Sequence, residues 1–203
     1  MNHRDLHPEQ LLRLAREGDP QALGQLFELY RNYLLLLARM EIGRRLQGKV
    51  DAADLVQETL LAAYRDFAQF RGTTEAELMS WLRRILAANL VDLVRRYYGA
   101  KRDVGLEHQL ADDLDRSSRD MGRVPAIKDS SPSQRAVRRE QAVLLADALE
   151  GLPADYGEVI VLHHLQGLSF PEVARRMGRS LDSVKKLWIR ALARLRDTLG
   201  GSV

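Results

Sequence analysis

Residues 168–195 read LSFPEVARRMGRSLDSVKKLWIRALARL, and this pattern predicts two helices joined by a tight turn. Ala174 is small where a second helix must cross closely, and Gly178 can adopt the positive φ that ends a helix. Ser180 or Asp182 can accept hydrogen bonds from the free N–H groups that open the second helix. The combination is typical of a helix-turn-helix that binds DNA.

The second of these helices is predicted to have one apolar face and one cationic face. From Arg175 to Arg196 the chain holds eight Lys or Arg residues against one acid, Asp182, whereas the net charge of the whole chain is only +3. Charge concentrated in this way neutralises phosphates and releases counterions, so it favours a nucleic-acid partner over an ordinary solvated helix pair. The residues expected to be buried are Val184, Leu187, Trp188, Ala191, Leu192 and Leu195.

The composition of the 203 residues excludes several classes of protein. There is no cysteine, so disulfides, thiolate zinc sites and cysteine nucleophiles are excluded. The N-terminus lacks the apolar core of a signal peptide, and the longest apolar run, residues 34–38, is too short to cross a bilayer. We therefore expect a cytoplasmic protein without membrane insertion. Helix-forming residues dominate and strand-like alternation is nearly absent, so the predicted fold class is all-α.

Four helices are expected in the first half of the chain. The first opens near Pro8 and ends at residues 18–20, which also start the second. The third begins near Asp51, and the fourth runs from Glu75 to about Tyr98. Their apolar faces are sufficient for a helical domain. The expected buried face of the third helix comprises Leu55, Val56, Thr59, Leu60, Ala63, Tyr64 and Phe67.

Residues 103–133 lack the helical spacing of apolar residues that the first half of the chain shows. They hold seven acids against four bases, with Gly, Ser and Pro scattered among them. Such a composition predicts a flexible acidic linker. We therefore expect two small helical domains, residues 1–102 and 134–203, with the helix-turn-helix in the second.

The third helix carries an acidic face opposite its core. A solvated surface is the default interpretation of such charge. A leucine at the end of the face keeps a second interpretation open, in which a partner helix with basic side chains packs here. The residues of this face, at i, i+3, i+4 and i+7, are Asp54, Gln57, Glu58 and Leu61.

The fourth helix adds a second basic surface, with a net charge of +5 over residues 83–102. The loop before it, residues 67–74, has aromatic residues at its entrance and small polar residues at its tip. Loops of this kind can hold an unstacked base, although Phe67 and Phe70 also suit a core position. The cations of the helix are Arg83, Arg84, Arg95 and Arg96, followed by Lys101 and Arg102.

Catalytic chemistry has little support in the sequence. His163 and His164 have no carboxylate or third ligand at metal spacing, so we expect a structural or DNA-facing role for them. There is no phosphate-binding glycine loop and no nucleophile elbow. We therefore expect no enzyme activity, no metal site and no cofactor.

Two parts of the chain resemble bacterial RNA polymerase sigma factors of the extracytoplasmic-function group. DLVQETLLAAYRDFAQFRG at 54–72, SWLRRI at 80–85 and DLVRR at 92–96 resemble the second conserved region of the family, and residues 152–196 resemble the fourth. The resemblance implies an alternative sigma factor that binds core RNA polymerase and directs promoter-specific initiation. A stand-alone helix-turn-helix regulator is the alternative, but it leaves the acidic face and the N-terminal basic helix without a role.

The resemblance also implies roles for individual residues. The face formed by Asp54, Gln57, Glu58 and Leu61 would dock on the clamp helices of the largest polymerase subunit, and part of the C-terminal domain would meet the flap of the second-largest subunit. An anti-sigma protein is a further implied partner. One departure is Ala88 where the family often has Asn, with Asn89 one place on. The minus-10 element would be melted and held by Phe70, Arg71, Thr73, Thr74, Arg83, Arg84, Asn89, Arg95 and Arg96. The minus-35 element would be read by Arg179, Ser180, Asp182, Ser183, Lys185, Lys186 and Arg190.

Overall fold

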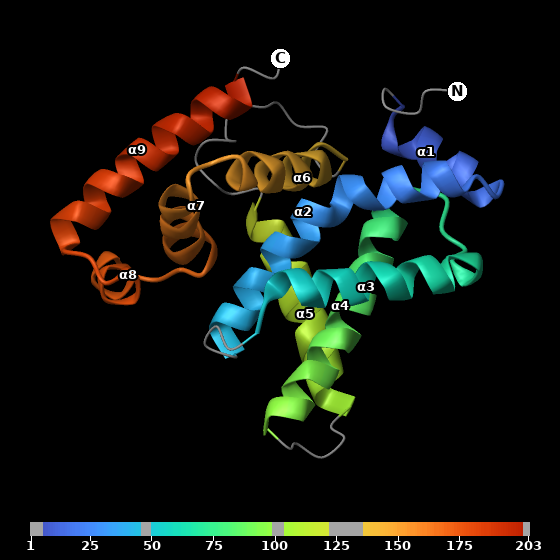
Figure 1. The fold of residues 1–203 in the computed structure, drawn as a ribbon, viewed down its shortest axis with the longest axis horizontal. Coiled ribbons are helices and arrows are strands. Elements are labelled where there is room, and N and C mark those ends of the chain that lie inside the picture. Colours follow the sequence, from blue (N-terminus) through green and yellow to red (C-terminus); the bar gives the residue numbers. More distant parts are fainter. Residues whose placement is uncertain (1–5, 46–49, 99–103, 122–135, 201–203) are drawn as a thin grey trace. The chain divides into compact units, whose positions relative to one another are not determined.

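The computed structural model describes residues 6–45, 50–98, 104–121 and 136–200, and every regular element in those ranges is helical (Figure 1). The all-α prediction is therefore confirmed. The chain forms two compact units, residues 1–116 and 117–203, which we call unit 1 and unit 2.

The first four helices of unit 1 begin and end close to where the sequence predicts. They are α1 (Pro8–Arg16), α2 (Pro20–Arg45), α3 (Ala52–Asp66) and α4 (Glu75–Tyr98). Local chemistry explains the boundaries. Gly18 has φ +95° between α1 and α2, and the carboxylate of Asp19 accepts from the N–H of Gln21 at 2.8 Å. Asp51 caps α3 in the same way, accepting from the N–H of Ala53 at 2.8 Å.

The core of unit 1 lies between α2, α3 and α4, with α1 packed on α2 (Figure 1). An aromatic cluster closes it near the end of α3, with ring centroids 5.1–6.2 Å apart. Tyr64 was expected to be buried, but it is 46% exposed, because its ring lies at the rim of this cluster and its hydroxyl donates to the carbonyl of Pro20. The cluster comprises Phe27, Tyr64, Phe67, Phe70 and Trp81.

The prediction of a linker without regular structure over residues 103–133 is wrong for its first part. Residues Val104–Met121 form a helix, α5, and Leu110 and Leu114 on it are fully buried. Leu110 and Leu114 lie four residues apart and so share one face of the helix, although acidic residues dominate the composition of this segment. The boundary between the two units falls inside this helix.

Unit 2 contains α6 (Ala136–Glu150), α7 (Ala154–Ile160), α8 (Phe170–Met177) and α9 (Leu181–Gly200), with a π-helical turn after α7 at Val161–Leu165. α9 packs against α6, α7 and α8. None of the helices within the described ranges of the chain has the length and apolarity to cross a bilayer. The buried core of unit 2 includes Leu145, Val159, Ile160, Val173, Val184, Ala191 and Leu195.

Candidate nucleic-acid and protein interfaces

The predicted helix-turn-helix is formed by α8 and α9. Gly178 adopts φ +63° at the turn, and the N–H of Arg179 donates to the carbonyl of Ala174 at 2.9 Å. Of the two candidate caps for α9, Ser180 has this role, since its hydroxyl accepts from the N–H of Ser183 at 3.2 Å. Local turn chemistry therefore fixes the angle at which α9 leaves α8.

The outer face of α9 is cationic. Lys185, Lys186 and Arg190 are exposed, on the side of the helix away from buried Val184. Asp182 forms an ion pair with Lys186, one turn on, at 2.8 Å, and this contact lowers the pKa of the Asp182 carboxyl. Because both side chains are largely exposed, the pair is weak enough for a phosphate to replace Asp182.

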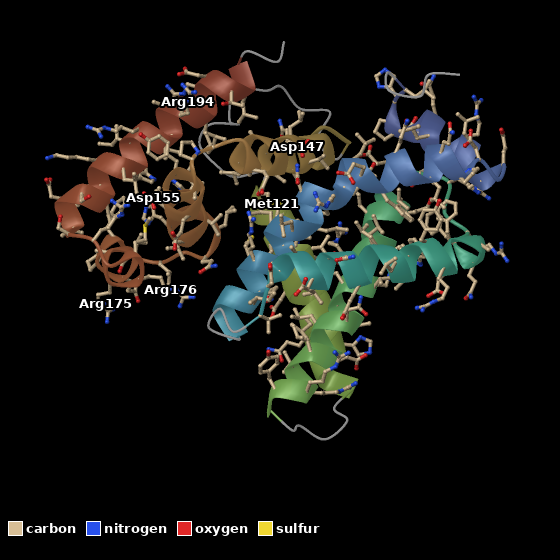
Figure 2. All side chains as sticks on the ribbon, in the orientation of Figure 1. Met121, Asp147, Asp155, Arg175, Arg176 and Arg194 are labelled. Atoms are coloured by element: carbon tan, nitrogen blue, oxygen red, sulfur yellow. The ribbon has the colours of Figure 1, made fainter. Side chains whose placement is uncertain are left out.

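Arg179 has a partner within unit 2. Its guanidinium pairs with the carboxylate of Asp155 at the start of α7, which ties the turn to the preceding helix. The sequence predicted a DNA contact for Arg179, and the structure gives it this second role. Other exposed cations extend the basic surface around it: Arg175 and Arg176 lie on α8 and Arg194 on α9 (Figure 2).

One exposed apolar residue of this face was missed by the sequence prediction. Ile189 is 60% exposed and lies between Lys186 and Arg190 on α9. The signal was present, because Ile189 falls outside the predicted apolar stripe of the helix. A branched side chain among cations can contact the methyl group of thymine in the major groove.

His163 and His164 occupy the π-helical turn and pack against α8 and α9. The His163 ring stacks on Phe170 at 4.0 Å, and its Nδ1 lies 2.7 Å from the carbonyl oxygen of Leu168. The indole N–H of Trp188 donates to Nε2 of His164 at 2.9 Å. An indole nitrogen can only donate, so His164 must be unprotonated at Nε2. The expected structural role is therefore supported by these contacts.

Acid should weaken unit 2 through His164. Burial, and then the neighbouring His163, lower the pKa of His164. Its neutral form is therefore favoured in the fold, so this stabilisation is complete above the unfolded pKa, about 6.5, and is lost as the pH falls toward the folded value. We expect the free energy of unfolding to decrease between pH 7.5 and 5.5 more in the wild type than in His164→Gln. Urea unfolding measures this, and His108→Gln, an exposed histidine, is the control. Equal pH dependence in wild type and His164→Gln would refute the assignment.

The loop before α4 exposes neither of its two candidate base-stacking aromatics, because Phe67 and Phe70 are both buried. Phe70 was predicted to contact the minus-10 element, but it is only 8% exposed and packs on Trp81 at 5.1 Å. The contact of Phe70 with the minus-10 element stays a prediction, and in this structure the ring lies against Phe67 and Trp81. Arg71, Thr73 and Thr74 are exposed, as predicted.

Glu77 ties the loop to the start of α4 by hydrogen bonds. Its carboxylate accepts from the N–H groups of Thr73 and Thr74, at 2.8 and 3.0 Å, and from the hydroxyl of Thr74 at 2.9 Å. These hydrogen bonds lower the pKa of Glu77. The side chains of Arg71 and Thr73, rather than these backbone N–H groups, are therefore the groups of the loop that can meet a ligand.

Gly72 is required by close packing in this loop. A Cβ atom at Gly72 would lie 2.3 Å from the Phe70 ring and 2.8 Å from Cβ of Glu77, so Gly72→Ala should lower the free energy of unfolding by about 1–3 kcal/mol. Gly24→Ala is the matched control, since among the described residues nothing lies within 4 Å of a Cβ there. Urea unfolding of both variants tests this. Similar stability of the two variants would show that the loop adapts freely.

The four arginines of α4 differ in their surroundings. Arg84 and Arg96 are exposed. Arg83 is mostly covered: its Nε donates to Asp115 on α5 at 2.5 Å, and its Nη1 donates to the hydroxyl of Tyr33 at 2.9 Å.

Arg95 and Asn89 also have partners inside unit 1. Arg95 pairs with Asp92 at 3.2 Å, and its Nε is buried without a hydrogen-bond partner among the described residues. The side-chain amide of Asn89 donates to the hydroxyl of Thr59 on α3 at 3.1 Å. Asn89 therefore joins two helices, which competes with its predicted contact to the minus-10 element.

The acidic face of α3 is exposed as predicted, and Leu61 is 64% exposed. A hollow of about 580 Å³ lies beside it between α2 and α3. The wall of the hollow mixes apolar and charged groups, which suits the side of another helix. It is lined by Gly24, Phe27, Glu28, Arg31, Ala53, Gln57, Leu60, Leu61 and Tyr64.

Comparison with known proteins matches both units. Residues 26–98 match the family model "Sigma-70 region 2", and residues 142–195 match "Sigma-70, region 4". The ECF RNA polymerase sigma factor SigM of Mycobacterium tuberculosis is 31% identical over 192 residues, which cover 94% of this chain and 84% of SigM. The chain belongs to the ECF family of RNA polymerase sigma factors. The ECF sigma-E factor of Haemophilus influenzae is 29% identical, with 92% of each chain covered.

Two further comparisons concern a longer relative and a solved structure. SigE of Mycolicibacterium smegmatis is 32% identical over 184 residues, which are 90% of this sigma factor but only 64% of SigE. Among solved structures, that of CnrH in complex with the cytosolic domain of CnrY is 27% identical, covers 97% of this chain and 99% of that chain, and has a TM-score of 0.36.

The two matched regions contain the surfaces described above. In this sigma factor, region 2 holds the acidic face of α3, the loop and α4, whereas region 4 holds the helix-turn-helix. A stand-alone regulator would need only the second, so the comparison favours the sigma factor. α5 lies outside both matched segments.

Proposed function

We propose that this sigma factor binds core RNA polymerase through α3 and positions it on promoters through two DNA-binding surfaces, one in each unit. The single observation that carries this proposal is the presence of a region 2 and a region 4 in one chain, each with its own exposed cations. We assign polymerase docking and the minus-10 element to residues 1–102, and the minus-35 element to residues 134–203.

The docking surface comprises Asp54, Gln57, Glu58 and Leu61, together with the adjacent hollow. Two exposed carboxylates next to an exposed leucine suit a partner helix that carries both basic and apolar side chains. We propose the clamp helices of the largest polymerase subunit as that partner.

For the minus-10 element we propose Arg71 and Thr73 of the loop as contacts to an unpaired base, with Arg84 and Arg96 on the phosphates. This assignment is supported by the exposure of these four side chains and by the fixed shape of the loop. Preorganised binding groups lose little conformational entropy when a ligand binds.

For the minus-35 element we propose that α9 enters the major groove, with Ser180 at its start. We further propose that core RNA polymerase, promoter DNA and an anti-sigma protein are the partners of this ECF sigma factor, and that it acts in the cytoplasm, where polymerase and DNA meet. The proposed role is one of binding rather than catalysis.

The test of the minus-35 assignment separates base reading from phosphate binding. We expect Lys185→Ala or Lys186→Ala to reduce discrimination between matched and mismatched elements by about 1–3 kcal/mol, and Arg190→Ala to weaken both alike. Ile189→Ala should lower the preference for thymine. Run-off transcription with core polymerase on promoters altered at single minus-35 positions measures each effect. If all four variants lose activity equally on every promoter, α9 does not read bases through these side chains.

A further inference from the structure

α5 is an acidic helix that is linked to α4 by the ion pair between Asp115 and Arg83. Its sequence, Val104–Met121, carries five acids against two bases. Despite this charge it is not simply solvated, because Leu110 and Leu114 are fully buried. It lies outside the segments that match regions 2 and 4, so those matches assign it no role.

The contact between α5 and α4 encloses a cation that would otherwise be able to bind phosphate. The side chain of Arg83 is only 16% exposed, held by Asp115 at 2.5 Å and by the hydroxyl of Tyr33 at 2.9 Å. The Asp115 side chain is 51% exposed, so it lies at the rim of the contact. Carboxylates and phosphates offer arginine the same kind of charged oxygen acceptor, so a phosphate oxygen can replace Asp115 as the partner of Arg83.

The geometry allows exchange between the two anions. The Asp115 carboxylate is half exposed, so an anion from solvent can reach the ion pair that links α5 to α4. Among the neighbouring acids of α5, Asp113 pairs with Arg116 on the same helix, and Asp112 is exposed. The apolar side of α5 includes the two buried leucines, Leu110 and Leu114.

We propose that α5 is a displaceable acidic cover, which binds Arg83 in the free sigma factor and is replaced there by the backbone of single-stranded promoter DNA. This inference rests on the proposed function, in which α4 faces the minus-10 strand. Displacement of α5 makes Arg83 a phosphate ligand and frees the helix from α4. A chain without DNA is thereby kept from binding nucleic acids indiscriminately through this arginine.

The test compares two charge-neutralising variants of the full chain. Asp115→Asn removes the partner of Arg83, and Asp112→Asn removes the same charge from the same helix three residues earlier. We expect Asp115→Asn to bind a fluorescent single-stranded minus-10 oligonucleotide about five-fold more tightly than Asp112→Asn, the effect of one partly exposed ion pair. This difference in affinity between the two variants should vanish when Arg83→Ala is also present. Circular dichroism verifies that helix content is retained.

Hydrogen exchange supplies a second measurement on the wild type. Adding the oligonucleotide should speed the exchange of the backbone amides of residues 108–116, because α5 leaves α4. Three results would each overturn the proposal that α5 covers Arg83. They are slower exchange in residues 108–116, equal affinity of the two aspartate variants for the oligonucleotide, and a higher affinity of Asp115→Asn that persists when Arg83→Ala is also present. The variant Arg84→Ala distinguishes failure of the cover proposal from failure of the proposed function. If Arg84→Ala also leaves binding unchanged, α4 is not the DNA-binding face; if it weakens binding, only the cover is refuted.

Discussion

Reversing two charges on α3, with Asp54→Lys and Glu58→Lys together, is expected to abolish binding of core RNA polymerase while the chain stays folded. Both carboxylates are exposed and lie one turn apart beside Leu61. In a complex they would meet basic side chains, so reversal replaces attraction by repulsion. Losing one charged partner at an interface costs about 2–5 kcal/mol, and every ~1.4 kcal/mol is tenfold, so affinity should fall at least about 100-fold.

Titration of labelled core polymerase measures this effect, and circular dichroism shows whether the variant is folded. The matched control is Glu17→Lys with Glu158→Lys, which changes the net charge equally at two exposed positions away from α3. If the α3 variant retains affinity, or the control loses as much, docking through this face is wrong.

Lengthening a promoter spacer by five base pairs is expected to reduce transcription by the holoenzyme about 100-fold or more. Five base pairs rotate one element by about half a turn and shift it by about 17 Å, so both elements cannot be bound at once. Simultaneous binding at two linked sites raises the affinity about 10²–10⁴-fold, and the longer spacer removes this increase.

The free sigma factor should respond differently to the same promoters. Each unit offers one basic surface of modest size, so binding to duplex DNA should be weak, strongly dependent on salt and nearly indifferent to the spacer. Fluorescence anisotropy with both promoters measures this beside run-off transcription. Tight binding by the free protein that depends on the spacer at physiological salt would favour the stand-alone regulator instead.

Features of this chain that depend on neighbours in sequence were predictable. The start of α3 follows from the cap at Asp51, and the turn between α8 and α9 follows from Gly178 and Ser180. The exposed face of α3 follows from spacing along a single helix, so Asp54 and Glu58 were found without the fold. Hydrogen bonds over two or three residues and a period of 3.6 are local properties.

Other features depended on residues far apart in sequence. Phe70 is buried against the rings of Phe67 and Trp81, and Asn89 reaches Thr59 thirty residues away. Composition predicted a linker where α5 packs its leucines, because an acidic helix is stable only with an apolar surface to cover.

Tertiary structure alone therefore decided which polar and charged groups find a partner on another helix. The sequence by itself determined that this is an all-helical ECF sigma factor with a basic helix-turn-helix and an acidic face on α3. It did not show that Arg83 binds Asp115, Arg179 binds Asp155 or His164 accepts from Trp188. Those pairs form because packing brings separate helices together, and burial then favours groups that find a partner over groups that lose water without one.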